Sequence, residues 1–285
     1  GIETGDDIFE NARRVVIAKQ VDPCDPSDYT FGLMYKQGIE RQGGSSDMFI
    51  RISRGFSANT DDFDAPVNVS AMTAVLDPDD DNATPKSSTW TEENLDDQSW
   101  ENLYENTFSP RAFLRGNEIY TGFEYTPNYA QAEQGNMPNN FYINQYIDAD
   151  GEGPEEMKWQ GPQNISFVYG RKTSTLDPRF IPAPKGIKDS PLATDISNPN
   201  VLVMTYGTFD MESGEEEDLH YTRSTDKGMT WERVAIDRED NVSTLDINES
   251  MVNAKLAAIQ DVQEKEVQTT VTPDGTVMYN VWLQE

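Results

Sequence analysis

Short alternating or aromatic-rich runs cover most of the chain, and Gly, Pro, Asn or Asp residues interrupt them. Side chains along a strand point alternately to opposite faces, so such runs predict β-strands. The best helical candidate, 249–265, keeps a poor helical period beside a strand-like run, so we expect mixed structure there. The pattern predicts an all-β protein with strands at 13–21, 30–38, 47–55, 117–125, 140–148, 165–170, 200–209, 218–224 and 276–284.

These runs repeat as a set. Each set has a strand with a central aromatic residue, a polar insertion, a second strand, an acidic turn that ends in Phe63, Trp159 or Trp231, and a closing strand. We therefore expect one all-β region over 1–285, built from units at 13–70, 111–166, 167–237 and an incomplete one at 250–285. Small antiparallel meanders that stack around an axis form a β-propeller, which the repeat favours over a β-sandwich. The predicted fold is thus propeller blades of four-stranded antiparallel meanders in a partial ring.

One octapeptide, STDKGMTW, contains an acid, a glycine and a tryptophan in a single turn. It resembles the Asp-box, the S-x-D-x-G-x-T-W repeat of sialidase-like β-propellers. In this turn we expect Asp226 to accept backbone N–H groups, and Gly228 to supply a positive φ. The tryptophan ring would be buried under the hairpin. In the family the box lies away from the catalytic centre, so the resemblance implies a structural clasp made of Ser224, Asp226, Gly228, Thr230 and Trp231.

The net charge of the protein limits the classes of partner that it can bind. The sequence has 51 acids against 22 bases and a net charge of −29, which disfavours nucleic acid and anionic membranes and suits divalent cations or a basic partner. Cys24 is the single cysteine, so an internal disulfide cannot form. No apolar run is long enough for a transmembrane segment. Because the sequence opens on Gly, we expect a processed, exported protein that is extracellular, on the cell surface or periplasmic.

Calcium is the cofactor that the acidic loops suggest. Asp148, Asp150 and Glu152 alternate around Gly151, a spacing that can direct carboxylates at a hard cation. Further acidic clusters lie at 77–84 and 213–218. The alternative for each cluster is a solvated charge run.

Five N-x-S/T triplets fit the glycosylation sequon, at 68–70, 82–84, 164–166, 241–243 and 248–250. The triplets at 68–70 and 164–166 fall at the ends of matching closing strands. Repeat geometry explains these two more simply than glycosylation.

The resemblance to sialidases also implies a set of catalytic residues. In the family this set is three Arg that bind a carboxylate, a Tyr nucleophile with a Glu partner, and an Asp acid/base. The family's early Arg-Ile-Pro signature is absent, and the run at 179–184 has a Phe between Arg and Ile. We expect no catalytic residues and a non-catalytic module that binds a protein partner, another part of the same precursor, or a glycan. The alternatives are a glycoside hydrolase completed by blades outside this chain, and a structural subunit of a surface assembly that docks by strand addition.

Overall fold

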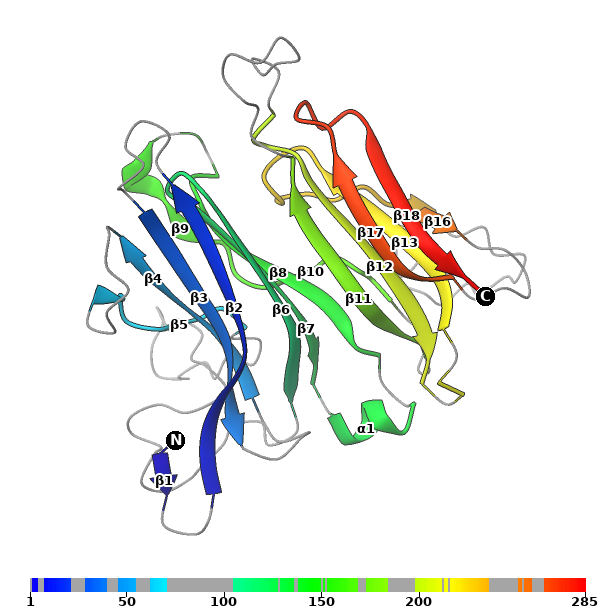
Figure 1. Ribbon diagram of the computed structural model, residues 1–285, viewed down its shortest axis with the longest axis horizontal. Helices are drawn as coiled ribbons and strands as arrows, with labels where there is room; N and C mark the ends of the chain where they lie inside the picture. The colour runs from blue at the N-terminus through cyan, green and yellow to red at the C-terminus, as the bar shows by residue number, and fades with distance from the viewer. Residues whose placement is uncertain are drawn as a thin grey trace, which may run out of the picture. The chain divides into compact units, whose positions relative to one another are not determined.

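The computed structural model describes residues 2–4, 8–21, 29–39, 46–54, 62–70, 105–127, 129–135, 138–149, 151, 153–168, 173–183, 198–211, 213–214, 216–235, 251–252, 254–257 and 264–285. These residues form antiparallel sheets, with helix α1 (Tyr129–Glu133) and the 3-10 turn η2 (Pro154–Glu156) as the helical elements described (Figure 1). The all-β prediction is confirmed. In the described part of the sequence, no helix has the length and apolar character that crossing a bilayer requires.

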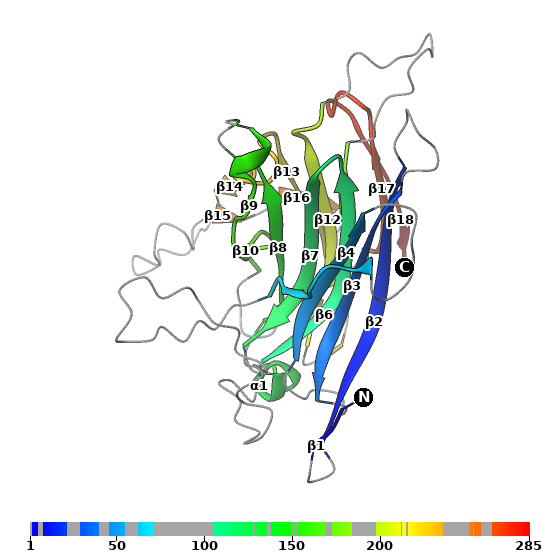
Figure 2. The ribbon, with the colours of Figure 1, turned by 90° about the vertical axis from the view of Figure 1, so that its left-hand side faces the viewer.

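The protein divides into two compact units, Gly1–Gln131 with Tyr142–Gln163, and Ala132–Phe141 with Asn164–Glu285. The first sheet of unit 1 has the order β1-β2-β3-β4-β5 and is antiparallel throughout (Figure 2). Its strands are β1 (Ile2–Thr4), β2 (Ile8–Val21), β3 (Tyr29–Ile39), β4 (Ser46–Arg54) and β5 (Val67–Asn68).

A second sheet has the order β6-β7-β8-β10, with β9 paired to β8. Its strands are β6 (Asn106–Arg115), β7 (Glu118–Thr126), β8 (Asn140–Ile147), β9 (Lys158–Trp159) and β10 (Gln163–Asn164). Within unit 1, β6 lies against β2, β3 and β4. The core between the sheets combines Met34, Met48, Ile50, Ile52 and Val69 with Ile119, Phe123 and Tyr125 of β7.

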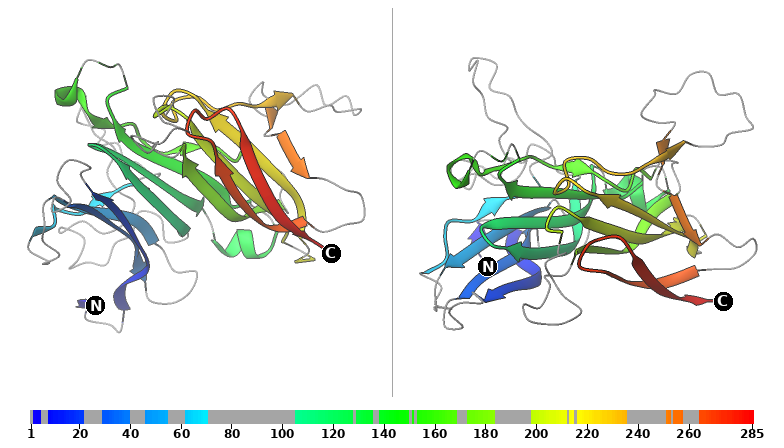
Figure 3. Two further views of the ribbon diagram at one scale, coloured as in Figure 1. Left: turned by 45° about the horizontal axis from the view of Figure 1, so that its top comes forward. Right: turned by 90° about the horizontal axis from the view of Figure 1, so that it is seen from above.

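Unit 2 contains the sheet β11-β12-β13-β16 and two hairpins, β14-β15 and β17-β18. Their bounds are β11 (Thr173–Pro182), β12 (Leu202–Asp210), β13 (Glu216–Ser224), β14 (Val234–Ala235), β15 (Met251–Val252), β16 (Ala254–Ala257), β17 (Glu264–Val271) and β18 (Met278–Gln284). β17 contacts β11, β12 and β13, as β6 contacts β2, β3 and β4. Figure 3 shows the β17-β18 hairpin, in red, beside the green and yellow strands of this sheet. The segment expected to be mixed, 249–265, is β-strand wherever it is described.

A β-bulge recurs in the first long strand of each of four sheets, and sequence reasoning missed it. The residues in the bulges of β2, β6, β11 and β17 are Arg14, Ser109, Asp177 and Glu266, with φ of 50°, 46°, 47° and 54°. None of them is glycine, so the same uncommon backbone conformation has been placed four times. β6 and β11 were absent from the predicted strands because each contains a proline, which is acceptable at a bulge but demotes a strand in a sequence pattern.

An aromatic residue on the next strand lies opposite each bulge. The pairing registers place Tyr35, Phe123, Tyr206 and Trp282 there, on β3, β7, β12 and β18. The first three are buried, at 9%, 0% and 1% exposed, whereas Trp282 is 38% exposed. The β17-β18 hairpin thus repeats the bulge and the opposing aromatic residue that the first two long strands of the other three sheets contain.

Each buried aromatic residue stacks on a ring of the strand that follows it. Tyr35 stacks on Phe49 of β4 with ring centroids 6.0 Å apart, and Phe123 stacks on Tyr142 of β8 at 6.2 Å. The protein's one histidine, His220 of β13, stacks in the same way on Tyr206 at 5.3 Å. The interplanar angles are 18°, 13° and 14°. This third strand of the repeat therefore contributes a stacked ring in all three sheets.

The first N-x-S triplet ties the closing strand to its neighbour. Ser70 Oγ donates to Asp47 Oδ1 at 2.8 Å and accepts from the Met48 N–H at 2.8 Å. Asn68 Nδ2 donates to Asp47 Oδ2 at 2.7 Å, and Asn68 Oδ1 accepts from the Ser70 N–H at 3.0 Å. These side chains therefore have a structural use.

The second triplet reproduces this arrangement. Ser166 Oγ donates to Asn140 Oδ1 at 2.7 Å and accepts from the Phe141 N–H at 2.9 Å. Asn164 Oδ1 accepts from the Phe167 N–H at 3.1 Å. The two triplets therefore make matching hydrogen bonds at the ends of their closing strands.

Lys36 of β3 is a half-buried cation in unit 1. Its Nζ donates to Asn106 Oδ1 at 2.6 Å and lies 4.8 Å from the centre of the Phe108 ring. Burial, with the nearby Arg14 and Arg13 charges, lowers the pKa of Lys36 to about 7. Between that value and the unfolded value of 10.5, the unfolded state binds a proton that the folded state does not, so stability rises with pH.

We predict that Lys36→Met raises the melting temperature at pH 6.5, by about 4 °C or more, because methionine fills the site without a charge to desolvate. The gain should shrink at pH 9.5, where the wild-type lysine is neutral in the folded state. Thermal melts at both pH values measure it, with Lys158→Met at an exposed site as the control. A gain that is independent of pH would contradict this account of Lys36.

Candidate functional site

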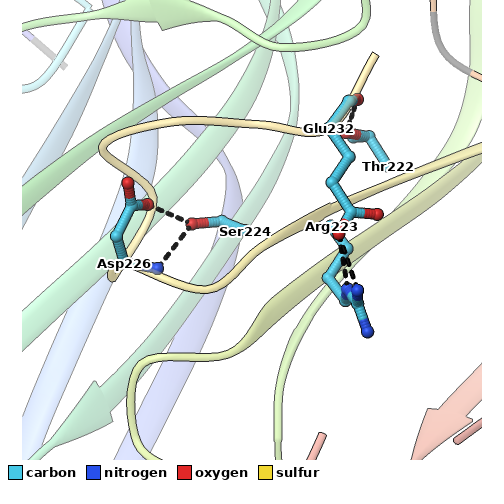
Figure 4. Close-up of polar contacts among 5 residues, drawn as sticks. All are labelled: Thr222, Arg223, Ser224, Asp226 and Glu232. Atoms are coloured by element: carbon cyan, nitrogen blue, oxygen red, sulfur yellow. Dashed lines mark hydrogen bonds and ion pairs between the residues drawn. The ribbon is translucent and has the colours of Figure 1, made fainter. Parts of the chain in front are cut away.

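The five residues of the predicted clasp lie in one turn that starts at Ser224, the last residue of β13, and ends before Glu232. Figure 4 shows two of the five, Ser224 and Asp226. Ser224 Oγ donates to Asp226 Oδ1 at 2.7 Å and accepts from the Gly228 N–H at 2.8 Å. Asp226 also accepts from the Thr230 N–H at 2.9 Å and from Thr230 Oγ1 at 2.6 Å. The carboxylate thus joins both ends of the turn, as its Asx-type chemistry predicts.

Trp231 completes the clasp. Its ring is buried and lies 6.2 Å from that of Phe180, and its Nε1–H donates to Gly228 O at 3.1 Å. Gly228 has φ of 88°, as the sequence suggests, but Lys227 has φ of 61° as well. The turn therefore needs two successive left-handed residues, of which the sequence reveals one.

Arg223 and Glu232 flank the turn (Figure 4). The Glu232 N–H donates to Arg223 O at 2.9 Å, and Thr222 Oγ1 donates to Glu232 O at 2.8 Å. Arg223 Nη2 and Nε both donate to Glu232 Oε1, at 2.6 Å and 2.9 Å. Both side chains are well exposed, so water screens this ion pair and the backbone bond closes the turn.

Burial alone would raise the pKa of Asp226. The hydrogen bonds from Thr230 and Ser224 outweigh burial and hold the pKa below its usual value. Because the folded-state pKa is depressed, this contribution to stability is complete above the unfolded pKa and is lost as pH falls through the folded pKa.

We predict that Asp226→Asn lowers the free energy of unfolding at pH 7 by about 1 kcal/mol, since water screens a partly exposed carboxylate. The difference from wild type should narrow as pH falls below 3.8, the unfolded value. Urea unfolding across pH 3 to 7 measures it. An equal difference at every pH would show that the charge of Asp226 is irrelevant to the clasp.

A second aspartate turn, between β17 and β18, was not predicted. Thr272 Oγ1 donates to Asp274 Oδ1 at 2.5 Å, and Asp274 also accepts from the N–H and Oγ1 of Thr276, at 3.1 Å and 2.8 Å. These bonds lower the pKa of Asp274, with the Thr272 bond the largest cause. Thr272 and Thr276, two positions before and after Asp274, are the sequence feature that could have predicted this turn. The tryptophan of the octapeptide is absent here.

Both turns hold the segment 198–201. The Lys227 N–H of the first turn donates to Asn200 O at 2.9 Å, and the Asn198 N–H donates to Pro273 O of the second turn at 2.7 Å. Gly275 has φ of 73°, and a Cβ there would lie 2.5 Å from Val201 Cγ2. The glycine is required both by its conformation and by this contact.

We predict that Gly275→Ala costs about 2 kcal/mol or more, because left-handed strain adds to a clash with Val201. Gly116→Ala is the matched control, since its φ is 62° but its Cβ would meet nothing within 4 Å. Chemical denaturation should show a smaller loss for the control, and Val201→Ala should recover part of the Gly275→Ala loss. Equal losses at the two glycines would exclude the Val201 contact as a cause.

The predicted calcium loop is partly described. Asp148 accepts the Gly151 N–H through Oδ1 at 2.8 Å and the Gly153 N–H through Oδ2 at 2.7 Å. Asp150 and Glu152 lie outside the described residues, as do the acidic residues at 77–84. Where the structure describes His, Cys, Asp and Glu, no three of them gather as a metal-binding group. Calcium binding stays a prediction, and Asp148 closes this loop through backbone hydrogen bonds.

A pocket of about 460 Å³ lies in unit 2 beside these turns. Val203, Val271 and Met278 line it together with Tyr221, Arg223, Glu232, Leu256, Gly275, Thr276 and Asn280. The volume suits a small ligand or a large side chain. Arg223 is the one arginine among its described lining residues, so the three-arginine grip of a sialidase is not assembled in it.

The outer face of β18 is the main exposed apolar surface of unit 2. Tyr279, Val281 and Leu283 alternate along the strand and are 61%, 67% and 51% exposed. Their pairing partners on β17 include Gln268 and Thr270, which are polar and exposed. The described strands give β18 a neighbour on one edge alone, β17. Tyr279, Val281 and Leu283 thus form an exposed apolar face on a strongly acidic protein.

Comparison with known proteins gives no family. No protein-family model matches the sequence, and no curated protein matches it. One solved structure, described as a BT0996 RGII complex, matches over 99% of this chain and 73% of its own length, with 11% identity and a TM-score of 0.33. That TM-score is too low to support an argument about fold or function, so the proposals below rest on the geometry of this chain.

Proposed function

We propose that this chain is a non-catalytic interaction module that binds a protein partner through the β17-β18 hairpin. The observation that carries the proposal is the exposed face of Tyr279, Val281 and Leu283. In an aqueous medium such a face favours burial against another apolar surface, and each large side chain contributes about 1–3 kcal/mol when fully buried. The net charge of −29 adds a preference for a basic partner.

The module belongs to the sialidase-like, Asp-box propeller class in this proposal. The clasp around Asp226 supports it, as does the recurrence of bulge and opposing aromatic residue in four sheets. An exported location is part of the proposal, with calcium at the Asp148 loop as its cofactor.

A glycan is the second candidate ligand. Tyr221 and Asn280 line the pocket with the Arg223–Glu232 pair, and such groups can hydrogen-bond to sugar hydroxyls. The pocket does not favour a hydrolase, because Arg223 is already ion-paired with Glu232.

We predict that peptides selected from a random display library against the wild-type protein lose binding to Val281→Asp by tenfold or more, about 1.4 kcal/mol. The matched control is Ile17→Asp, which adds the same charge at a strand position that is 69% exposed in unit 1. Titrations by biolayer interferometry measure both variants, with a glycan array as the second arm. Selected peptides that bind Val281→Asp as well as wild type would contradict the proposal, and array binding lost in Tyr221→Ala would favour the glycan.

A further inference from the structure

β18 has the composition of a central strand. Its counterparts β7 and β12 carry similar apolar and aromatic residues, and both are buried along nearly their whole length. Each counterpart lies between two strands, whereas β18 is exposed at five of its seven residues and half-buried at the other two. The recurring features of the fourth sheet, Glu266 in its bulge and Trp282 opposite, are nevertheless in place.

The third strands of the repeat show what covers this position. β4 lies antiparallel beside β3, and β13 lies antiparallel beside β12. Phe49 pairs directly with Tyr35, and His220 pairs directly with Tyr206, so each stack joins residues in register. Trp282 is the fourth aromatic residue of the series, and the described strands place no such neighbour beside it.

The pockets of the two units differ in the same way. In unit 1, the corresponding space between β4 and β7 holds Tyr146 and Trp159, whose ring centroids are 5.6 Å apart, and a pocket of about 160 Å³ remains. In unit 2, the space bordered by β13 and β18 is about 460 Å³. The larger volume of the unit 2 pocket is enough to hold bulky side chains of a further strand.

We infer that the partner is an extended polypeptide segment that adds antiparallel to the edge of β18 that no described strand occupies, and that it stacks an aromatic ring on Trp282. This inference rests on the proposed function and specifies the partner. The segment has apolar residues at alternate positions, as β4, β8 and β13 do. Main-chain hydrogen bonds supply affinity in such strand addition, and the ring at one register supplies selectivity.

Charge also bears on the composition of that segment. The exposed Glu266 lies on the hairpin, within a protein that has 51 acids. A lysine or arginine beside the added strand would complement this charge, whereas a second copy of this chain would bring two charges of −29 together.

The probe is a synthetic peptide with the sequence of residues 139–148, flanked by two lysines at each end, which contains the ring that stacks on Phe123 in unit 1. We expect this peptide to slow hydrogen exchange of alternate backbone amides between Asn280 and Leu283 by about tenfold. A peptide with Ser in place of the Tyr142 equivalent should bind more weakly, and Trp282→Ala should weaken the parent peptide to the same extent. Ile17→Asp is the control variant.

The outcomes separate the inference from the proposed function. Library peptides that depend on Val281 but leave β18 amide exchange unchanged would overturn strand addition while the interaction surface stands. If no library peptide binds more weakly to Val281→Asp than to the wild-type protein, both the proposed function and strand addition are overturned. Protection of the β18 amides that grows with protein concentration alone, with a dimer in sedimentation, would identify a second copy of the chain as the occupant and overturn a basic partner.

Discussion

Each thin sheet in this protein has an apolar face that must be covered, and in both units the cover is the first strand of the following hairpin. β6 contacts β2, β3 and β4, and β17 contacts β11, β12 and β13. Ala112 and Leu114 of β6 pack against the buried cluster that contains Met34, and Val271 of β17 belongs to the buried cluster that contains Val203. Burial of apolar area is the dominant favourable contribution to folding. Each sheet is therefore stabilised by a strand of the hairpin that follows it in the sequence.

Polar side chains stabilise the strand ends and turns, where few apolar side chains are buried. Ser70 and Ser166 tie closing strands to their neighbours, and Asp226 and Asp274 close two turns. Each hydrogen bond of the buried Ser70 and Ser166 hydroxyls contributes about 1 kcal/mol, and these bonds hold the strand ends in register. The lone Cys24 can form no internal disulfide, so such short side chains take the role that cross-links have in small exported domains.

Alternation and turn residues were enough to predict the all-β class and most second and third strands, because those strands have regular patterns without proline. The octapeptide was enough to predict the hydrogen bonds of Asp226, since Asp226 and Thr230 interact within one turn. Sequence reasoning missed β6 and β11 because each contains a proline, and it missed the four bulges because only a three-dimensional register reveals them. It could not find the half-buried Lys36 or the pocket beside Tyr221 either, because both depend on segments that are distant in sequence.

The equivalence of the four hairpins gives physical meaning to the exposure of Trp282. A bulge with positive φ is uncommon outside glycine, and it persists where the surroundings impose it. At three sites a stacked pair of rings lies opposite the bulge. At the fourth site the bulge at Glu266 already exists before any third strand is added. The hairpin is therefore preorganised, and an incoming strand would bear mainly the cost of its own ordering. Preorganisation of this kind favours a binding surface over an accidental exposed edge.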